Sequence, residues 1–481
     1  MFVSFLFNSH KCKRKNFKLY IFSKRKMTKI NEIIKSTEET LEGSSIHAIP
    51  NIIRNKFLIV KAVWCICFLV SFGFCCWFIV ESIFSYLSYD IVTSIKVSFE
   101  NKLKFPIVSI CNLNYFATDY SFLVTKALFN STQPDMSLMF FAKILSNLMV
   151  EKYGLDNKKL GYGLNETIIN CNFSWEKCNL TNDFEEYFDN WYGRCFRFNS
   201  GKNMYGESVE QKYVYQSGTF GALDLQFFIG SASSNDKPFS YENGFNIFIN
   251  DKIVNTMTKE GIRISPGGSI SLAVDKSMVK RKAKPYSDCT ENLIDINSYN
   301  SEFYRKVLIQ NKKYDYNDCS YLCFQKYLGQ ECGCQASIYG KLVFYTDMRI
   351  CSLPNDNMTL IDMENDNICF YNNVAKYANK PSDQRDCDCP FECDVTNYEH
   401  KISWAEFPTK QYYLNYLSQS KLIKSKLSSI NYNDVKQSVA RVQIFYDDMK
   451  QMLIEENEKT KISDLVSNIG GTLGLFLGIF I

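Results

Sequence analysis

Histidine is scarce in this chain, which has three among 481 residues. Neither an H-E-x-x-H nor a G-x-S-x-G sequence occurs. We therefore expect neither a zincin-type metal site nor the nucleophile elbow of a hydrolase. The glycine clusters "GTFGA" (218–222) and "PGG" (266–268) lack the basic helix start of a phosphate loop. A net charge of +4, without a stripe of basic and aromatic residues, argues against nucleic acid. We therefore expect no enzyme, no metal, no cofactor and no nucleic-acid partner.

Cysteine, in contrast, is abundant. Nineteen cysteines are present, and fourteen of them lie between Cys111 and Cys393. The same stretch holds five Asn-x-Ser/Thr triplets, at Asn130, Asn165, Asn172, Asn179 and Asn357. An even number of cysteines beside glycosylation triplets indicates an oxidising, secretory compartment. Metal binding is the alternative for "CGC" (332–334) and "CDC" (387–389), but only His400 lies near them, so we expect disulfides.

One long stretch carries no charge at all. Residues 62–80 read "AVWCICFLVSFGFCCWFIV", nineteen residues between Lys61 and Glu81. This length spans a hydrocarbon core as a helix, and the segment lacks the polar face of a soluble helix. Lysine and arginine crowd its N-terminal side, which predicts a cytosolic N-terminus and an extracellular remainder. "MFVSFLF" is a poor signal peptide, and Met27 is an alternative start to Met1.

The region after this span has no Pro/Gly/Ser linker and no repeat, and we expect one large domain. Apolar and polar residues alternate in residues 90–99 and 244–251, which predicts half-buried strands. Residues 301–329 and 408–422 have the length and periodicity of helices. The expected fold is α+β, with a β-rich core and peripheral helices.

A second apolar run closes the sequence. Residues 465–481 carry no charge over seventeen positions, and Gly470, Gly474 and Gly478 recur every four residues on one helix face. Small residues on one face allow transmembrane helices to approach closely. The run is barely long enough to cross a bilayer and lacks a closing anchor, so we expect a truncated second span, with a tail anchor or interfacial helix as the alternative.

The expected organisation is therefore a cytosolic segment, a span, an extracellular disulfide-rich domain and the start of a second span. Their predicted bounds are residues 1–56, 57–81, 82–462 and 463–481.

Four motifs in this order carry a resemblance to a known family. They are "FPIVSICNLN" (105–114), "YGRCFRFNSG" (192–201), "CDCPFECDVTNYEHKISWAEFP" (387–408) and "SDLVSNIGGTLGLFLG" (463–478). The chain resembles the degenerin/epithelial sodium channel family, which includes acid-sensing and peptide-gated channels, over about residues 44–480. The resemblance implies a trimeric, amiloride-sensitive, sodium-selective channel of the plasma membrane, with an acid-sensing-channel-like ectodomain and bilayer lipid, sodium and related subunits as partners.

The resemblance also implies how the cysteines pair, which sequence alone does not choose. The implied bridges are Cys111–Cys195, Cys171–Cys178, Cys289–Cys393, Cys319–Cys389, Cys323–Cys387, Cys332–Cys369 and Cys334–Cys351. Five of them would brace a helical "thumb" so that its movement reaches the pore.

Further residues take family roles by position. Gly478, Ile479 and Phe480 overlie the Gly-x-Ser selectivity constriction, and Ser467 overlies the position where bulky residues hold degenerin channels open. Pore-helix packing is expected of Gly470, Gly471 and Gly474, and pore–thumb contact of Tyr89 and Tyr286. His47 matches the cytosolic His-Gly gating pair, but Ala48 replaces its glycine, which disfavours a re-entrant turn that needs a positive φ.

These features favour a subunit of a ligand-gated cation channel, and a neuropeptide is our preferred ligand. Proton gating is disfavoured, because Asp90 and Ile91 stand where acid-sensing relatives carry histidines. Phe480 replaces the serine of the constriction, and a large ring there would close a narrow pore. The alternative is a non-conducting, membrane-anchored regulatory or binding subunit.

Overall fold

The computed structural model describes ten stretches of the chain, and the statements below concern these residues. They are 35–121, 156–189, 191–230, 242–253, 260–311, 313–335, 342–351, 360–380, 387–427 and 430–479. The chain divides into two compact units. The first comprises Met1–Val92 and Asn457–Ile481, and the second comprises Thr93–Glu456.

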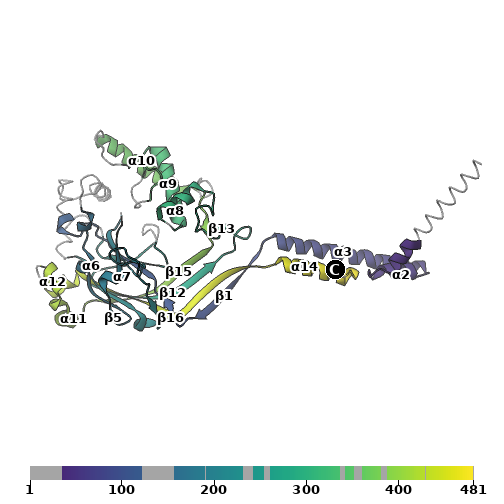
Figure 1. Cartoon of the computed structure of the whole chain (residues 1–481), viewed down its shortest axis with the longest axis horizontal. Coiled ribbons are helices and arrows are strands. Elements are labelled where there is room, and N and C mark those ends of the chain that lie inside the picture. Colours follow the sequence, from purple (N-terminus) through teal and green to yellow (C-terminus); the bar gives the residue numbers. More distant parts are fainter. Residues whose placement is uncertain are drawn as a thin grey trace, which may run out of the picture. The chain divides into compact units, whose positions relative to one another are not determined.

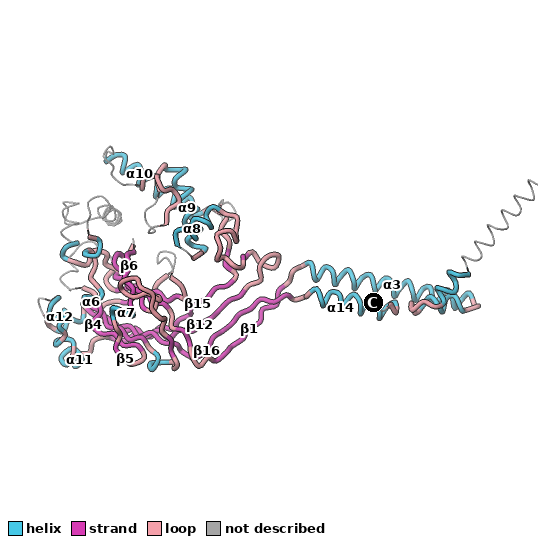
Figure 2. The backbone as a smooth tube through the Cα atoms, viewed as in Figure 1, coloured by secondary structure: helices cyan, strands magenta, loops and turns pink. Residues whose placement is uncertain are grey.

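Two β-sheets form the centre of the second unit (Figure 2). The larger sheet has the order β15-β12-β16-β9-β4-β5, with β1 also paired to β16; its strands are β1 (Ile91–Phe99), β4 (Ile168–Phe173), β5 (Glu176–Lys177), β9 (Leu223–Phe228), β12 (Gly268–Lys280), β15 (Asp394–Glu406) and β16 (Val439–Glu458). The other has the order β11-β10-β3-β7-β6, from β3 (Ile107–Asn112), β6 (Phe184–Asp189), β7 (Gly193–Phe198), β10 (Phe245–Asn250) and β11 (Ile262–Ile264). Two short ribbons pair β2 (Leu103–Lys104) with β8 (Tyr213–Val214) and β13 (Cys289–Thr290) with β14 (Phe391–Glu392).

The strands predicted at residues 90–99 and 244–251 are therefore present, as β1 and β10. Their predicted half-burial is wrong, because β1 is exposed along nearly its whole length and β10 is mostly buried. A shared core lies between the two sheets, and Phe105 of the "FP" motif is at its centre with no exposed surface. The Phe105 ring contacts Phe173 edge-on at 5.0 Å and Phe198 at 5.9 Å between centroids. Asn199, at φ 62°, ties this motif to the next one, because its Nδ2 donates to the Phe105 carbonyl at 2.6 Å. Interlocking aromatic burial is what the motif residues contribute to the fold.

Helices lie at the edges of this unit (Figure 1). They are α6 (Leu164–Thr167), α7 (Leu180–Asp183), α8 (Glu302–Asn311), α9 (Tyr316–Cys332), α10 (Leu360–Asn379), α11 (Lys410–Asn415), α12 (Lys421–Lys426) and α13 (Tyr432–Lys436), with 3₁₀ turns η1 (Asn157–Lys159), η2 (Gly218–Gly221) and η6 (Leu417–Gln419). We refer to α8, α9 and α10 as the helical lobe. The lobe has a hydrophobic core of its own, separate from the core of the sheets.

The structure corrects two helix predictions. Residues 301–329 form two helices rather than one, because Asp315 has an extended backbone and its carboxylate accepts the Asn317 amide to start α9. Residues 408–422 likewise break into α11, η6 and the start of α12, where Ser420 caps the new helix through the Ile423 amide. Side-chain capping competes with helix continuation, and periodicity alone does not register it.

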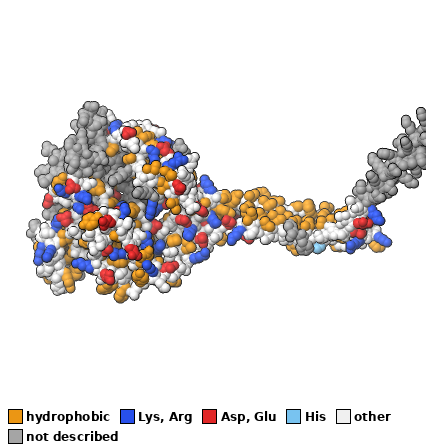
Figure 3. Space-filling model, viewed as in Figure 1, with side chains coloured by type: hydrophobic (Ala, Val, Ile, Leu, Met, Phe, Trp, Pro, Cys, Tyr) orange, Lys and Arg blue, Asp and Glu red, His pale blue; other side chains and the backbone are white. Residues whose placement is uncertain are grey.

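The first unit contains α2 (Ala48–Arg54), α3 (Leu58–Leu87) and α14 (Ile462–Leu477), and described residues 35–42 are helical as well. α3 is long and apolar enough to cross a membrane, and Figure 3 shows hydrophobic side chains gathered along it. It continues beyond the expected limit at residue 81 and ends where Tyr89 takes a φ of 52°. α14 is apolar but has sixteen residues, fewer than a full bilayer crossing needs.

Candidate functional site

The first unit brings the expected pore residues beside α3. The Phe476 ring of α14 stacks on two rings of α3 that are one helical turn apart. Its centroid lies 6.4 Å from that of Phe74 and 5.7 Å from that of Phe78, with interplanar angles of 21° and 20°. A ring held between two others fixes both the rotation and the depth of α14 against α3.

α14 stops at Gly478, within the predicted selectivity motif. Gly478 has a φ of 74°, and its amide donates to the Gly474 carbonyl at 3.0 Å. The next amide, of Ile479, reaches back to the Leu473 carbonyl at 3.3 Å. A left-handed glycine with a bond to the carbonyl four residues earlier closes the helix as an αL cap. Glycine is needed here for a second reason. An added Cβ would lie 2.8 Å from both His47 Nε2 and the Ser45 carbonyl oxygen.

The segment before α2 therefore contacts the end of α14. The His47 amide donates to the Leu477 carbonyl at 3.2 Å. Ala48 starts α2, and its predecessor His47 already has right-handed backbone angles of −51° and −36°. Ala48 has no positive φ, as expected for alanine, and the chain reaches Leu477 with a helical backbone at this position instead. The re-entrant turn itself stays a prediction.

At the opposite end of the helix pair, an ion pair joins the residues that follow α3 and precede α14. Lys459 Nζ lies 2.9 Å from Asp90 Oδ2, and the Lys459 amide donates to the Asp90 carbonyl at 3.0 Å. The hydrogen bond and charge of Lys459 hold the pKa of the Asp90 carboxyl below its usual value. The sequence singled out Asp90 only as the replacement of a histidine found in acid-sensing relatives. No pattern in the sequence around Lys459 indicated that it would pair with Asp90.

The small residues of α14 lie on open surface. Among the described residues, no heavy atom outside the local helix comes within 4 Å of a Cβ built at Gly470 or Gly471. Ser467 is exposed, and Gly474 is half-buried. Within the selectivity motif, Ile479 is half-buried, while Phe480 lies outside the described residues. One side of α14 thus packs on α3, and another offers small side chains.

The two tyrosines expected to couple pore and thumb fall in different units. Tyr89 closes α3, with its ring 6.3 Å from that of Tyr86. Tyr286 lies in a turn of the second unit, where its amide donates to the Ala283 carbonyl. Their contact remains a prediction.

Seven disulfides join the fourteen cysteines of the second unit, in the pairs that the resemblance implied. They are Cys111–Cys195, Cys171–Cys178, Cys289–Cys393, Cys319–Cys389, Cys323–Cys387, Cys332–Cys369 and Cys334–Cys351. The last five lie in or beside the helical lobe. Groups of three or more metal-ligating side chains do not occur in the described stretches.

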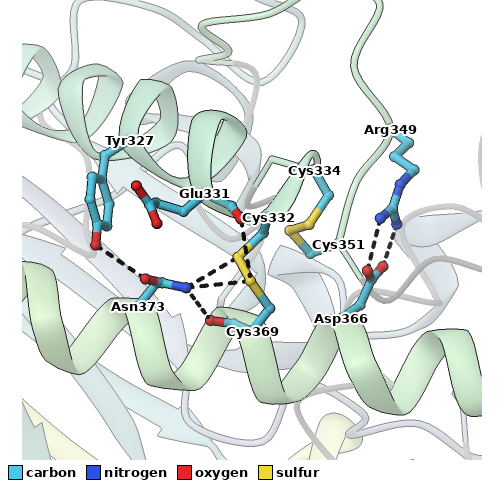
Figure 4. The surroundings of a disulfide bond; sticks show 9 residues. All are labelled: Tyr327, Glu331, Cys332, Cys334, Arg349, Cys351, Asp366, Cys369 and Asn373. Carbon is cyan, nitrogen blue, oxygen red and sulfur yellow. Dashed lines mark hydrogen bonds and ion pairs between the residues drawn. A yellow bond between two sulfur atoms is a disulfide. The ribbon is translucent and has the colours of Figure 1, made fainter.

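Figure 4 shows how one disulfide of the lobe is embedded. The Asn373 amide group donates to Cys332 Sγ at 3.4 Å and to Cys369 Sγ at 3.3 Å. Tyr327 from the facing helix donates to Asn373 Oδ1 at 3.1 Å. Nearby, Arg349 forms a two-pronged ion pair with Asp366. Covalent and polar ties act together here, so α9 and α10 are held as one piece.

Sequence reasoning missed a charge cluster that joins the loop after β10 to the base of the lobe. Lys252 Nζ lies 2.7 Å from Glu392 Oε1 and 3.2 Å from Asp315 Oδ2. Burial raises the pKa of the Glu392 carboxyl, although Lys252 opposes the shift. These residues are distant in sequence, and no spacing pattern could have linked them.

Three of the predicted glycosylation residues are described. Asn165 and Asn179 are exposed, and Asn172 is half-buried in β4. Asn179 also caps α7, because its Oδ1 accepts the amides of Thr181 and Asn182. Asn130 and Asn357 lie outside the described residues.

A membrane-length helix packed on a second apolar helix, together with a disulfide-rich unit of sheets and braced helices, defines a membrane-anchored receptor or channel class of protein. Comparison with known families is more specific. The amiloride-sensitive sodium channel family model matches residues 40–480, and the chain belongs to this family.

The curated relatives are channels with different stimuli. The human bile acid-sensitive ion channel is 25% identical over 479 residues, which cover 95% of this chain and 85% of that protein. The FMRFamide-activated amiloride-sensitive sodium channel of Cornu aspersum is 22% identical, and the match covers 91% of this chain and 79% of that protein. Acid-sensing ion channel 1 of Gallus gallus is 24% identical, and the match covers 92% of this chain and 81% of that protein. Among solved structures, a proton-activated chloride channel covers 86% of this chain and 93% of its own, with a TM-score of 0.31 at 5% identity.

Proposed function

We propose that this chain is a subunit of a trimeric, sodium-selective channel of the plasma membrane, opened by an extracellular ligand. Its N-terminus is cytosolic, the second unit is extracellular and α14 lines the pore. The observation that carries the proposal is the two-sided character of α14. Phe476 anchors one side on α3, whereas Gly470 and Gly471 leave another side open. A helix built in this way suits close packing around a shared axis.

The break at Gly478 supports the same assignment. Helix ends turn backbone carbonyls away from the helical ladder, and such carbonyls can replace part of the hydration shell of a cation. The Leu473 and Gly474 carbonyls are engaged by the cap, so the following residues, Gly478 and Ile479, are the candidates for the narrow passage.

The proposed ligand is a peptide rather than a proton. Asp90 is held ionised by Lys459, and its lowered pKa places its titration below the mildly acidic range. His400 is exposed on β15, and it is the single histidine between the two apolar runs. The snail relative is by its name activated by FMRFamide, which makes amidated peptides the first class to screen.

The experiment is to express the full chain in oocytes and record sodium currents during a peptide screen. We expect a current that amiloride blocks and that falls when potassium replaces sodium. Ser467→Cys should add a persistent current when a charged methanethiosulfonate reagent is applied, because a bulky group at this position prevents close packing. The unmodified chain, with its native cysteines in α3, is the matched control. Surface expression without current under any condition would favour the non-conducting regulatory subunit.

A further inference from the structure

The outer end of the α3–α14 pair is held by contacts between residues far apart in sequence. Asp90 and Lys459 meet through both side chains and backbone, at 2.9 and 3.0 Å. Beside them, Ser85 Oγ and Thr460 Oγ1 lie 3.4 Å apart. All four residues belong to the first unit.

Both charged residues stand at a joint between a helix and a strand. Asp90 lies between the end of α3 at Leu87 and the start of β1 at Ile91. Lys459 lies between the end of β16 at Glu458 and the start of α14 at Ile462. A few backbone rotations at such a joint would swing the whole helix. A contact that joins the two joints therefore limits the swing of the helices at the place where small backbone rotations would cause it.

The start of α14 is tightly coupled to this tie. Lys461 has an extended backbone, and its amide donates to Asp464 Oδ2 at 3.1 Å, which fixes the first turn of α14. A single residue, Thr460, separates Lys459 from this cap. A displacement of Lys459 thus moves the first turn of α14 rather than being absorbed by a flexible linker.

We propose that Asp90 and Lys459 are a positioning pair, a charge-dependent latch that holds the outer end of α14 against α3 and limits its movement during gating. The gating role rests on the proposed channel function, whereas the latch itself does not. The side chains are 48% and 52% exposed, so the latch is reversible and sensitive to salt. Exposed ion pairs change an equilibrium by roughly two- to fivefold, and this is the size of effect expected.

Cross-linking of the full chain tests the latch without any current. Ser85→Cys with Thr460→Cys places two thiols where the hydroxyls nearly touch, and copper–phenanthroline supplies the oxidant. A protease site inserted within residues 231–241 then separates two fragments, because none of the seven disulfides joins a cysteine before that segment to one after it. The fragments stay together on a non-reducing gel only when the new bond has formed. Thr460→Cys alone controls for pairing with the native thiols of α3.

Asp90→Asn should slow this cross-linking roughly two- to fivefold. The reversed pair Asp90→Lys with Lys459→Asp should restore the rate, which a purely steric role would not. Salt at 1 M should slow cross-linking of the double-cysteine chain with native Asp90 and Lys459 to the rate seen with Asp90→Asn. The cross-linking rate of the Asp90→Asn variant should not change with salt. Glu455→Gln is the matched control, since it removes another exposed ion pair of the β1–β16 ladder, at 3.0 Å from Lys96, and should have no effect.

An unchanged rate in Asp90→Asn, or a reversed pair that stays slow, overturns the latch. In a conducting channel, Asp90→Asn and Lys459→Gln should change the current at a fixed stimulus in the same direction, and the reversed pair should return it to the wild-type level. If cross-linking responds to the substitutions as expected but the current stays the same in every variant, the gating role is refuted and the latch is not. A chain that carries no current refutes the proposed function, while the cross-linking still decides the latch.

Discussion

The helical lobe and the α3–α14 pair solve the problem of holding helices together in opposite ways. Five disulfides lie in or beside the lobe, and its core is filled by buried aromatic and aliphatic side chains. In the described part of the first unit the four cysteines are unbridged, and α14 is held by a ring stack, an ion pair and a few hydrogen bonds. Leu475, at 77% exposed, shows how much apolar surface the pair leaves uncovered.

The difference separates a part that is braced by covalent bonds from a part that is held by reversible contacts. Disulfides constrain a fold at every moment, whereas ion pairs and ring contacts form and break within the native state. Apolar surface left open on α14 needs lipid or another helix to cover it. The lobe is therefore complete by itself, and the helix pair is not. Four further predictions test this contrast.

The largest effect is expected from disulfide removal in the lobe. Replacing all four cysteines of the nested Cys319–Cys389 and Cys323–Cys387 bridges by alanine releases a loop with a sequence separation of 64 and should cost about 4 kcal/mol. Removing the Cys171–Cys178 bridge, with a separation of 7, should cost about 2 kcal/mol, because the released chain gains less entropy. Chemical unfolding of the full chain in detergent measures both. Equal losses would show that loop entropy does not explain how the lobe is braced.

The base of the lobe should respond to pH when its cation is removed. Lys252→Met leaves Glu392 without this partner and should cost about 1–3 kcal/mol at pH 7. Burial raises the pKa of Glu392 above its unfolded value, so protonation favours the fold as the pH falls through that raised pKa. In thermal unfolding measured at pH 7 and at pH 5, the variant should therefore lose less stability relative to wild type at the lower pH.

Lys284→Met is the matched control, because its ion pair with Asp288 is far more exposed, at 74% and 90% of the two side chains. It should have little effect and no pH dependence. A Lys252→Met variant that is equally destabilised at both pH values would mean that Glu392 is not the group left unpaired.

The end of α14 should be sensitive to a single methyl group. Gly478→Ala forces alanine into a left-handed conformation, at about 1–2 kcal/mol, and pushes its Cβ against His47 and Ser45. Hydrogen exchange of the His47 amide should become faster, since its bond to the Leu477 carbonyl is lost. Gly471→Ala, which faces open space, should instead stabilise α14 by about 0.5–1 kcal/mol. Unchanged exchange at His47 in Gly478→Ala would contradict the contact.

The smallest effect is expected from the ring stack. Phe476→Leu keeps an apolar side chain but removes the ring contacts, so the helix pair should weaken by about 0.5–1.5 kcal/mol. Labelling of Cys75, which is 1% exposed, by a membrane-permeant maleimide follows the separation of α3 from its neighbours. It is read at that residue by mass spectrometry, because Cys65, Cys67 and Cys76 of the same helix are exposed. Phe72→Leu, whose ring stacks on Phe68 of the same helix, should not change the labelling rate. Faster labelling in both variants would point to general loosening of α3.

Local sequence patterns predicted the elements that local chemistry specifies. The uncharged run at residues 62–80 predicted a membrane-length helix, and alternation predicted β1 and β10. Helix limits were predicted less well, because they depend on single side chains such as Asp315 and Ser420 that capture a backbone amide. The motif at His47 and Ala48 gave no sign of the local structure, in which Ala48 starts α2 and the His47 amide donates to the Leu477 carbonyl.

The membrane-length helix, the presence of disulfides and the family were all readable from the chain, since they depend on composition, spacing and ordered motifs. The contacts that position the site were not. Lys459 meets Asp90 across 369 residues, and Lys252 meets Glu392 across 140. Only folding brings such groups within the few ångströms at which charges and hydrogen bonds act, because these forces depend on distance in space and not along the chain.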